Sequence, residues 1–306
     1  MSKAAQIGLV VRGHGRHYVV EDQDGVRVHC LTRGKKSDCV VGDRVRWARS
    51  SDHEGVIERV EPRRNLLFRQ DEWKTKSFAA NLDRLLVLVA VEPQFSESQL
   101  TRALIAAESA GIAADIVLNK TDLGGADAAR ARLAPYTAMG QRVLELSFKG
   151  RPEEARETLH PLLQGQSTLV LGPSGTGKST LINLLVPDAQ AQVGEISQAL
   201  NSGRHTTTTT QWYWTEPAPA DGRARSALID SPGFQEFGLR QIAAPDLASY
   251  MPDFKPYLGE CRFHNCSHRH EPGCAVLVAV EAGRISPSRY RIYDELWDEL
   301  SAPPKY

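Results

Sequence analysis

The sequence lacks the features that mark secreted, membrane and fibrous proteins. Its opening residues, Met-Ser-Lys-Ala-Ala-Gln, contain no apolar stretch of the kind found in a secretory signal. The longest aliphatic run, Leu85 to Val91, is far shorter than the roughly 20 residues that a helix needs to cross a bilayer. No compositional bias or internal repeat points to a fibrous or disordered chain. We therefore expect a globular, cytoplasmic protein that does not enter a membrane.

The chain also carries no net charge, because its 37 Lys and Arg residues balance its 37 Asp and Glu residues. Overall charge therefore argues neither for nor against an anionic partner such as RNA. The charges are unevenly distributed: residues 1–80 hold 16 basic and 11 acidic side chains, which leaves 21 basic and 26 acidic for the rest. At 306 residues the chain is long enough for two or three domains, of which the first is mildly basic.

Cysteine is scarce, and three of the five cysteines lie close together in the sequence. Cys261, Cys266 and Cys274 are interspersed with histidines, whereas Cys30 and Cys39 lie far away. In a reducing compartment such a cluster indicates a metal site before a disulfide. Three thiolates and one imidazole form the ligand set of a closed, tetrahedral structural zinc site. A set of free cysteines in a reduced loop is the alternative. The candidate imidazoles are His264, His268 and His270.

Short alternating or β-branched stretches, separated by glycine-bearing turns, fill the first 60 residues. They predict a small all-β barrel of the oligonucleotide-binding (OB) type, although the periodicity also suits other small barrels. The predicted strands lie near 7–12, 17–21, 26–31, 44–47 and 56–60. Cations among and after these strands can track a nucleic-acid backbone, and a merely solvated basic surface is the alternative. They are Arg33, Lys35, Lys36, Arg44, Arg46, Arg49, Arg63, Arg64 and Arg69.

A polar linker at 71–81 precedes an alternation of strands and helices. The strand at 82–91 is almost wholly apolar, as strands inside a parallel sheet are. Ser96 and Gln99 form a capping box for the next helix, which ends at Gly111. Further strands are predicted at 115–118, 142–146, 167–171 and 226–229, with helices at 126–139, after Pro152 and at 179–186. The alternation predicts a doubly wound α/β domain with a mostly parallel sheet.

The most informative motif is a glycine-rich loop between the strand at 167–171 and the helix at 179–186. It matches Gly-x4-Gly-Lys-Ser/Thr completely and stands in the strand, loop and helix order that this motif requires. Its backbone N–H groups can surround a phosphate, Lys178 can reach the terminal phosphates, and the Ser179 hydroxyl can ligate Mg²⁺. A chance glycine-rich turn is the alternative. The predicted nucleotide-binding residues are Gly172, Pro173, Ser174, Gly175, Thr176, Gly177, Lys178, Ser179 and Thr180.

A second motif, Asn119-Lys120-Thr121-Asp122, directly follows a buried strand, which places it at the carboxyl edge of the sheet where nucleotides bind. The Asp122 carboxylate can accept hydrogen bonds from the ring N–H and the exocyclic amino group of guanine, a pair that adenine does not offer. Lys120 can lie across the base, and Asn119 can tie this loop to the phosphate loop. Ser147, in the turn after the next strand, is a weaker candidate for a contact to the base. An ordinary polar turn is the alternative for both segments.

Asp230-Ser231-Pro232-Gly233 ends the strand at 226–229 that follows the phosphate loop. Asp230 can reach Mg²⁺ through water, and the Gly233 N–H can meet the terminal phosphate. In ordinary small GTPases the guanine motif comes after these segments, whereas here it precedes the phosphate loop by about fifty residues. This order predicts a circularly permuted GTPase domain.

The permuted order, the N-terminal barrel and the Cys/His cluster together resemble the ribosome small-subunit-dependent GTPases of the RsgA (YjeQ) family. The resemblance covers almost the whole chain and includes Gly-Arg-His-Thr-Thr-Thr at 203–208, Asp-Ser-Pro-Gly-Phe at 230–234 and the segment 261–274. It implies a barrel, a permuted GTPase domain and a zinc domain in which His268 is the fourth ligand. It also implies that the small ribosomal subunit, with its 16S rRNA and neighbouring proteins, stimulates GTP hydrolysis during late maturation. The family often has Thr where this chain has Ser231.

Hydrolysis requires an oriented water molecule, which Ras-type proteins hold with a glutamine directly after Asp-x-x-Gly. Here that residue is Phe234, whose ring cannot hold water by hydrogen bonding, so unaided turnover is expected to be slow. His205 is the candidate to orient the water, and the resemblance implies a catalytic histidine there. A loop histidine that contacts RNA or only solvent is the alternative. Thr207 or Thr208 is expected to complete the Mg²⁺ shell.

These motifs predict an OB-type barrel at 1–75 that contacts RNA, a circularly permuted GTPase domain at 76–240 and a zinc-binding domain with a C-terminal helix at 241–306. The expected activity is hydrolysis of GTP to GDP and phosphate, with Mg²⁺ bound beside GTP and one structural Zn²⁺. The expected partner is the small (30S) ribosomal subunit, and the protein is expected to be a monomer. A P-loop ATPase and a non-hydrolysing RNA-binding scaffold are the other two classes considered.

Overall fold

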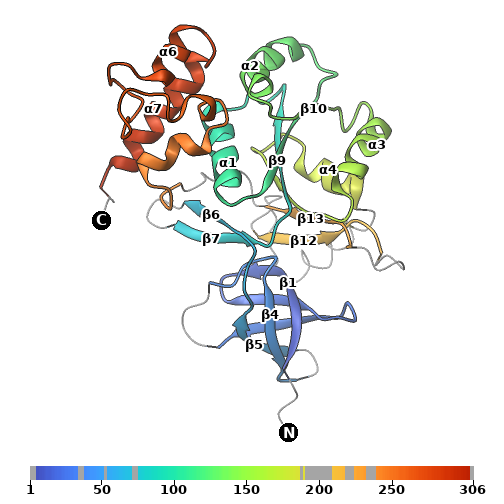
Figure 1. Cartoon of the computed structure of the whole chain (residues 1–306). Coiled ribbons are helices and arrows are strands. Elements are labelled where there is room, and N and C mark those ends of the chain that lie inside the picture. Colours follow the sequence, from blue (N-terminus) through green and yellow to red (C-terminus); the bar gives the residue numbers. More distant parts are fainter. Residues whose placement is uncertain are drawn as a thin grey trace.

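The computed structural model describes residues 5–33, 38–51, 54–70, 75–186, 189, 209–217, 224–231 and 239–303 of the chain. Within these residues, a β-barrel forms one end of the molecule, a sheet covered by helices forms the middle, and a helical unit lies beside the helices (Figure 1). None of the helices in these ranges combines the length and the apolar character that crossing a bilayer requires.

The barrel is built from β1 (Gln6–His14), β2 (His17–Glu21), β3 (Arg27–Thr32), β4 (Arg44–Arg49) and β5 (Glu54–Val60). The strand β1 pairs with both β2 and β4, and β3 lies parallel to β5, so the sheet closes on itself. Inward-facing side chains alternate with outward-facing ones, and Val10, Val20 and Trp47 fill the interior. The predicted OB-type barrel is confirmed.

The central sheet contains, in spatial order, β10 (Val143–Glu145), β9 (Ala113–Asn119), β8 (Arg84–Ala90), β11 (Ser167–Leu171), β13 (Ala227–Asp230) and β12 (Thr210–Trp214). All run parallel except β12, which is antiparallel to β13. On β8, Leu85 and Val87 face one apolar cluster while Leu86 and Leu88 face another, so both faces of the sheet are buried. The predicted doubly wound, mostly parallel sheet is confirmed.

Helices cover the two faces: α1 (Glu97–Ser109), α2 (Ala126–Ala138), α3 (Pro152–Leu163) and α4 (Lys178–Leu185). The buried residues of α1 and α2 join the cluster around Leu85, and those of α3 and α4 join the cluster around Leu86. The helix α1 begins at Ser96, whose hydroxyl accepts a hydrogen bond from the Gln99 N–H at 3.3 Å. Each helix therefore packs its apolar side against one face of the sheet.

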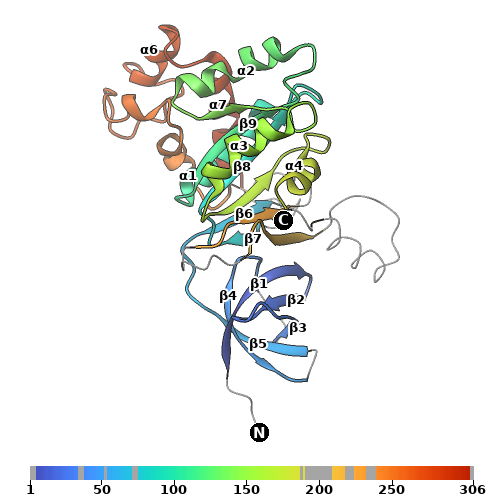
Figure 2. The same cartoon turned by 90° about the vertical axis from the view of Figure 1, so that its right-hand side faces the viewer.

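The described part of the polar linker predicted at 71–81 contains a strand. β6 (Leu66–Gln70) and β7 (Thr75–Ala80) form an antiparallel hairpin between the barrel and α1 (Figures 1 and 2). Leu67, Ala79 and Ala80 are buried, because the hairpin packs against the core of the central sheet. The first residues of β7 are polar and only its end is apolar, so the sequence pattern of this strand resembles that of a linker.

The barrel and the central sheet are hydrogen-bonded to each other. The barrel strand β1 pairs antiparallel with β12, with Arg12 opposite Gln211 and Gly13 opposite Thr210. The Trp214 Nε1–H donates to Glu21 Oε1 at 2.7 Å across the same junction. The strand β12, which begins at the last threonine of the run, is therefore shared between the barrel and the central sheet.

The C-terminal unit contains the 3-10 turns η1 (Ala244–Tyr250) and η2 (Lys255–Tyr257) and the helices α6 (Ala275–Glu281) and α7 (Pro287–Ser301). Its buried residues, among them Phe254, Tyr293 and Leu296, belong to the same apolar cluster as α1. This stretch therefore buries more apolar side chains than its many polar residues indicate, and the unit shares its core with α1 and the central sheet.

A buried ion pair fixes the C-terminal unit on α1. Arg289 is only 1% exposed and donates from Nε and Nη2 to the two oxygens of Asp253, both at 2.9 Å. Its third contact, from Nη1 to Thr101 Oγ1 of α1 at 2.7 Å, crosses between the two units. Because a buried guanidinium is costly without partners, this full set of acceptors defines how the units dock.

Candidate functional site

The glycine-rich loop leads from the end of β11 into the first turn of α4. Gly177 precedes α4 with φ +108°, a left-handed conformation that side chains rarely adopt. A Cβ atom at Gly177 would also lie 2.4 Å from Asn119 Nδ2, so the loop approaches the guanine motif as closely as a glycine allows. The first turn of a helix presents N–H groups without a helical acceptor, which suits a bound phosphate.

Lys178, the first residue of α4, turns its side chain back toward this loop. Its Nζ donates to the carbonyl oxygens of Gly172 at 2.6 Å and Pro173 at 3.0 Å. Burial lowers the pKa of Lys178, and the negative charge of Asp230 acts in the opposite direction. Asp230 is 6% exposed and pairs with Val170 of β11 in the parallel register. A cation and a carboxylate thus meet at the edge of the sheet where a phosphate and a divalent metal ion can be held together.

Asn119 joins the guanine motif to two other loops. It ends β9 and is 3% exposed. Its Nδ2 donates to the Thr176 carbonyl of the phosphate loop at 2.8 Å, and its Oδ1 accepts from the Phe148 N–H at 3.1 Å. Lys120 adopts φ 64° and donates from Nζ to the Glu92 carbonyl at 2.7 Å. The loops after β8, β9, β10 and β11 are therefore tied into one surface at the carboxyl edge of the sheet.

Asp122 lies at the exposed side of this surface. Its Oδ1 accepts from the Ser147 hydroxyl at 2.5 Å. The hydrogen bond from Ser147, followed by a backbone hydrogen bond and the charges of Arg151 and Lys120, lowers the pKa of Asp122 below its usual value. An ionised carboxylate with one side open to solvent is an acceptor for the paired N–H groups of guanine.

The remaining predicted residues of this site are His205, Thr207, Thr208 and Gly233. They lie outside the described residues, as does Phe234. The neighbouring Thr210 begins β12, and Ser231 donates from Oγ to the Val170 carbonyl at 2.9 Å. Ser231 therefore contacts the strand that enters the phosphate loop, and β12 lies one strand further along the sheet.

The four predicted metal ligands come together in the C-terminal unit. The ligand atoms of Cys261, Cys266, His268 and Cys274 all lie within 4.8 Å of one another. The sulfurs of Cys261 and Cys274 are 3.9 Å apart, and each lies 3.5 Å from His268 Nδ1. A tetrahedral zinc site requires about 3.8 Å between two sulfurs and about 3.6 Å between sulfur and nitrogen. The cluster has the donor set and the spacing to hold a metal ion.

Glu271 was not among the predicted site residues, yet it organises the loop of this cluster. Its carboxylate accepts from the Ser267 N–H at 2.7 Å, the Ser267 hydroxyl at 2.5 Å and the Arg269 N–H at 3.2 Å. Burial raises the pKa of Glu271, but the hydrogen bonds from Ser267 and the loop backbone outweigh this and hold the pKa well below its usual range. The position of Glu271 between His268 and Cys274 is the sequence signal that could have indicated this role.

The cations of the barrel are partly neutralised by acidic neighbours. Arg46 pairs with Glu61 at 2.9 Å, and Arg63 pairs with Asp43 at 2.7 Å. Arg49 and Arg64 also have acidic partners, in Asp22 and Asp83. Over the described residues of the barrel, Arg33 and Arg44 are exposed and make no ion pair. The basic surface is therefore smaller than the count of arginines predicts.

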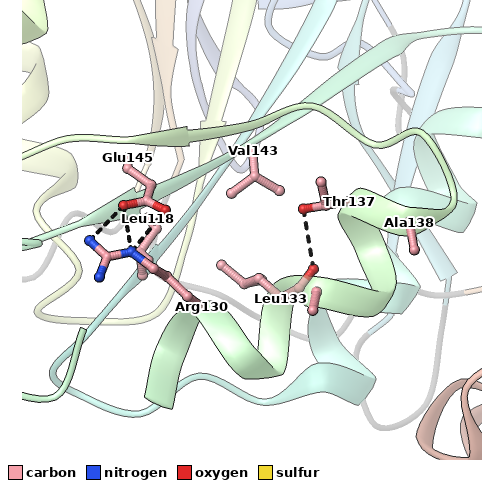
Figure 3. A pocket seen from close by; sticks show the side chains of 8 residues that line it. Leu118, Arg130, Leu133, Thr137, Ala138, Val143 and Glu145 are labelled. Carbon is pink, nitrogen blue, oxygen red and sulfur yellow. Dashed lines mark hydrogen bonds and ion pairs between the residues drawn. The ribbon is translucent and has the colours of Figure 1, made fainter. Parts of the chain in front are cut away.

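A groove of about 530 Å³ lies away from these sites, between α2 and the strands β9 and β10 (Figure 3). Apolar side chains such as Leu133 and Val143 line it, and the ion pair of Arg130 and Glu145 stands at one end. None of the predicted nucleotide or metal residues lines this groove. It has no part in the chemistry considered above.

Comparison with known proteins identifies the family. The sequence profile of the RsgA GTPase matches residues 60–240. A protein of Variovorax paradoxus (strain S110), named small ribosomal subunit biogenesis GTPase RsgA, is 59% identical over 299 residues, which are 96% of this chain and 92% of that protein.

Solved structures agree over almost the whole chain. YjeQ from Thermotoga maritima is similar with a TM-score of 0.71 and 29% identity over 98% of this chain and 100% of that one. YloQ, described as a circularly permuted GTPase, gives a TM-score of 0.69 and 26% identity over 99% and 98%. These findings confirm the family resemblance and the permuted order of motifs. The chain belongs to the RsgA GTPase family.

Proposed function

We propose that this protein binds GTP with Mg²⁺ at the carboxyl edge of its central sheet and hydrolyses it to GDP and phosphate when bound to the small ribosomal subunit. As a member of the RsgA family it is a GTPase of small ribosomal subunit biogenesis. Stimulation by the subunit, and action late in its maturation, are the finer parts of the proposal. They rest on the motifs that the chain shares with the family.

The observation that carries the proposal is the double hydrogen bond of Asn119, which joins the base-reading loop to the phosphate loop. In such an arrangement Asp122 reads the guanine edge while Lys178 and the first turn of α4 hold the phosphates. Mg²⁺, held by Ser179, Asp230 and a threonine at 207 or 208, would neutralise charge that develops on the transferred phosphoryl group. The Gly233 N–H would contact the terminal phosphate.

The metal of the C-terminal cluster is proposed to be one structural Zn²⁺. All four ligands come from the protein, which leaves no position for a catalytic water. We propose that the chain divides into a barrel at 1–75 that contacts 16S rRNA, a GTPase domain at 76–240 and a zinc domain at 241–306. The protein is proposed to act in the cytoplasm as a monomer, with the barrel and the zinc domain contacting the subunit.

Phosphate release from GTP, measured with and without purified small subunits, tests the function. We expect slow turnover alone and an increase on the order of tenfold or more with subunits, because a partner must complete the orientation of water. ATP should give no subunit-dependent phosphate. Turnover that does not respond to subunits would contradict the proposal and would favour a scaffold that only binds RNA.

His205 is proposed to orient the attacking water, and replacing it with Ala is expected to lower subunit-stimulated turnover about a hundredfold, the usual range for a residue that handles a proton or a water. GTP affinity should stay within about twofold, because the base and the phosphates are held by other residues. The matched control is His160→Ala, which removes an exposed histidine in the last turn of α3. Stimulated turnover equal to that of this control would rule out the role.

A further inference from the structure

The turn after β10 is folded around the hydroxyl group of Ser147. This oxygen accepts a hydrogen bond from the Gly150 N–H at 3.0 Å, and it donates its own proton to Asp122 Oδ1 at 2.5 Å. The Ser147 carbonyl accepts from the Arg151 N–H at 2.9 Å, which closes the turn. Because the Gly150 N–H occupies a lone pair of the hydroxyl, the Ser147 proton is directed to Asp122.

Gly150 leaves no space for a side chain in this turn. A Cβ atom there would lie 2.8 Å from Ser147 Oγ and 3.1 Å from Asp122 Oδ2. Any larger residue would push against both members of the Ser147–Asp122 pair. The absence of a side chain at Gly150 therefore leaves the space that the Asp122 carboxylate occupies.

Arg151 holds the other side of the guanine motif. Its Nη2 donates to Thr121 Oγ1 at 2.9 Å, and its Nη1 donates to the two oxygens of Glu154 at 3.0 and 3.1 Å. Thr121 gives its own hydroxyl proton to the Leu146 carbonyl at 3.1 Å, and its N–H points to the same carbonyl at 3.3 Å. Arg151 thus completes a set of three contacts that fix the residue next to Asp122.

The charge of Arg151 acts in the same direction as these contacts. The hydrogen bond from Ser147 is the main cause of the low pKa of Asp122, and the cations of Arg151 and Lys120 lower it further. Lys120 belongs to the recognised motif, whereas Arg151 lies at the start of α3 in another part of the chain. The position and the pKa of the Asp122 carboxylate therefore depend on residues outside the tetrapeptide at 119–122.

We propose that Gly150 and Arg151 are positioning residues that set the preference for guanine: Gly150 admits the Ser147–Asp122 pair, and Arg151 fixes Thr121 beside it. Neither residue needs to touch the base. The inference rests on the proposed binding of guanine nucleotides, and it adds two residues from the turn after β10 to those that determine the base.

The test compares the affinities of GDP and inosine diphosphate, which lacks the 2-amino group that Asp122 is expected to bind. Gly150→Ala should weaken GDP binding about tenfold, because it disturbs a hydrogen bond to a charged group. Arg151→Ala should weaken it about threefold to fivefold, as expected for a half-exposed charged contact. The affinity for inosine diphosphate should fall less than the affinity for GDP in each variant. The preference for GDP over inosine diphosphate should therefore decrease.

The matched control is Arg156→Ala, because Arg156 lies on the same helix and pairs with Glu153 at the same spacing as Arg151 and Glu154. It should leave both affinities within about twofold, as an exposed pair of this kind contributes little. Arg151→Lys keeps the charge but not the forked geometry, and it should restore part of the preference. Melting temperatures of all variants establish that they are folded.

Equal weakening of GDP and inosine diphosphate, or affinities of Arg151→Ala equal to those of the control, would overturn the inference. If Gly150→Ala does not fold, Arg151→Ala is sufficient to test the inference. The Arg151 side chain is 48% exposed and contributes little to the hydrophobic core, so its removal should not prevent folding. Failure of the wild-type protein to prefer GDP over ADP would instead contradict the proposed function. The two failures are therefore distinguishable.

Discussion

Replacing Asp122 with Asn is expected to weaken GDP binding about a hundredfold and to favour xanthosine diphosphate in its place. The Asp122 carboxylate already accepts one hydrogen bond from Ser147 and has a second oxygen for the base. An amide in this position presents an N–H group to the N–H groups of guanine, so a bidentate pair worth roughly 1–3 kcal/mol is lost and replaced by repulsion. Xanthine carries a carbonyl where guanine carries the amino group, and it can accept from the new amide.

Titration calorimetry with GDP and xanthosine diphosphate measures this exchange. Asp127→Asn is the matched control, because Asp127 is an exposed acid on α2 that pairs only with Arg130 among the described residues. It should alter neither affinity by more than about twofold. An Asp122→Asn protein that still prefers GDP over xanthosine diphosphate would show that another group reads the base.

Loss of the metal is expected to have the second large effect, confined to the C-terminal unit. Cys261→Ser should not bind the proposed Zn²⁺, because a hydroxyl does not replace a thiolate as a ligand. A structural zinc ion contributes several kcal/mol of folding free energy, so the melting temperature should fall by about 10 °C or more. The loop at 261–274 should unfold, whereas α7 keeps the contacts of Arg289 with Asp253 and Thr101.

Hydrogen exchange locates this unfolding. The N–H groups of Ala275 and Leu277 point to the sulfurs of Cys261 and Cys274 at 3.4 and 3.5 Å, so their exchange should rise about a hundredfold without the metal. Cys30→Ala, in the barrel, is the control and should keep one equivalent of zinc. If Cys261→Ser bound zinc as the wild type does, a different set of ligands would have to be sought.

Much of the candidate site was predictable because its parts are local in sequence. The glycine loop, Asn119 to Asp122 and the cysteine spacing each place several functional groups within a few residues, where strand or helix geometry fixes their relation. The strands and helices of the central sheet followed for the same reason, from the continuous apolar run at 82–91 and the capping residue Ser96. The hairpin of β6 and β7 was missed, because the polar residues near its middle conceal its apolar ends, which pack on a core built from distant parts of the chain.

Residue types at short spacing were enough to predict the guanine nucleotide chemistry, the barrel, the permuted order of motifs and the Cys/His cluster. Tertiary packing determines which loops touch. It joined Asn119 to Thr176, placed Gly150 and Arg151 around Asp122, paired β1 with β12 and docked Arg289 on α1. These contacts connect residues far apart in the chain, and they form only when the packing of whole elements brings their side chains within hydrogen-bonding distance.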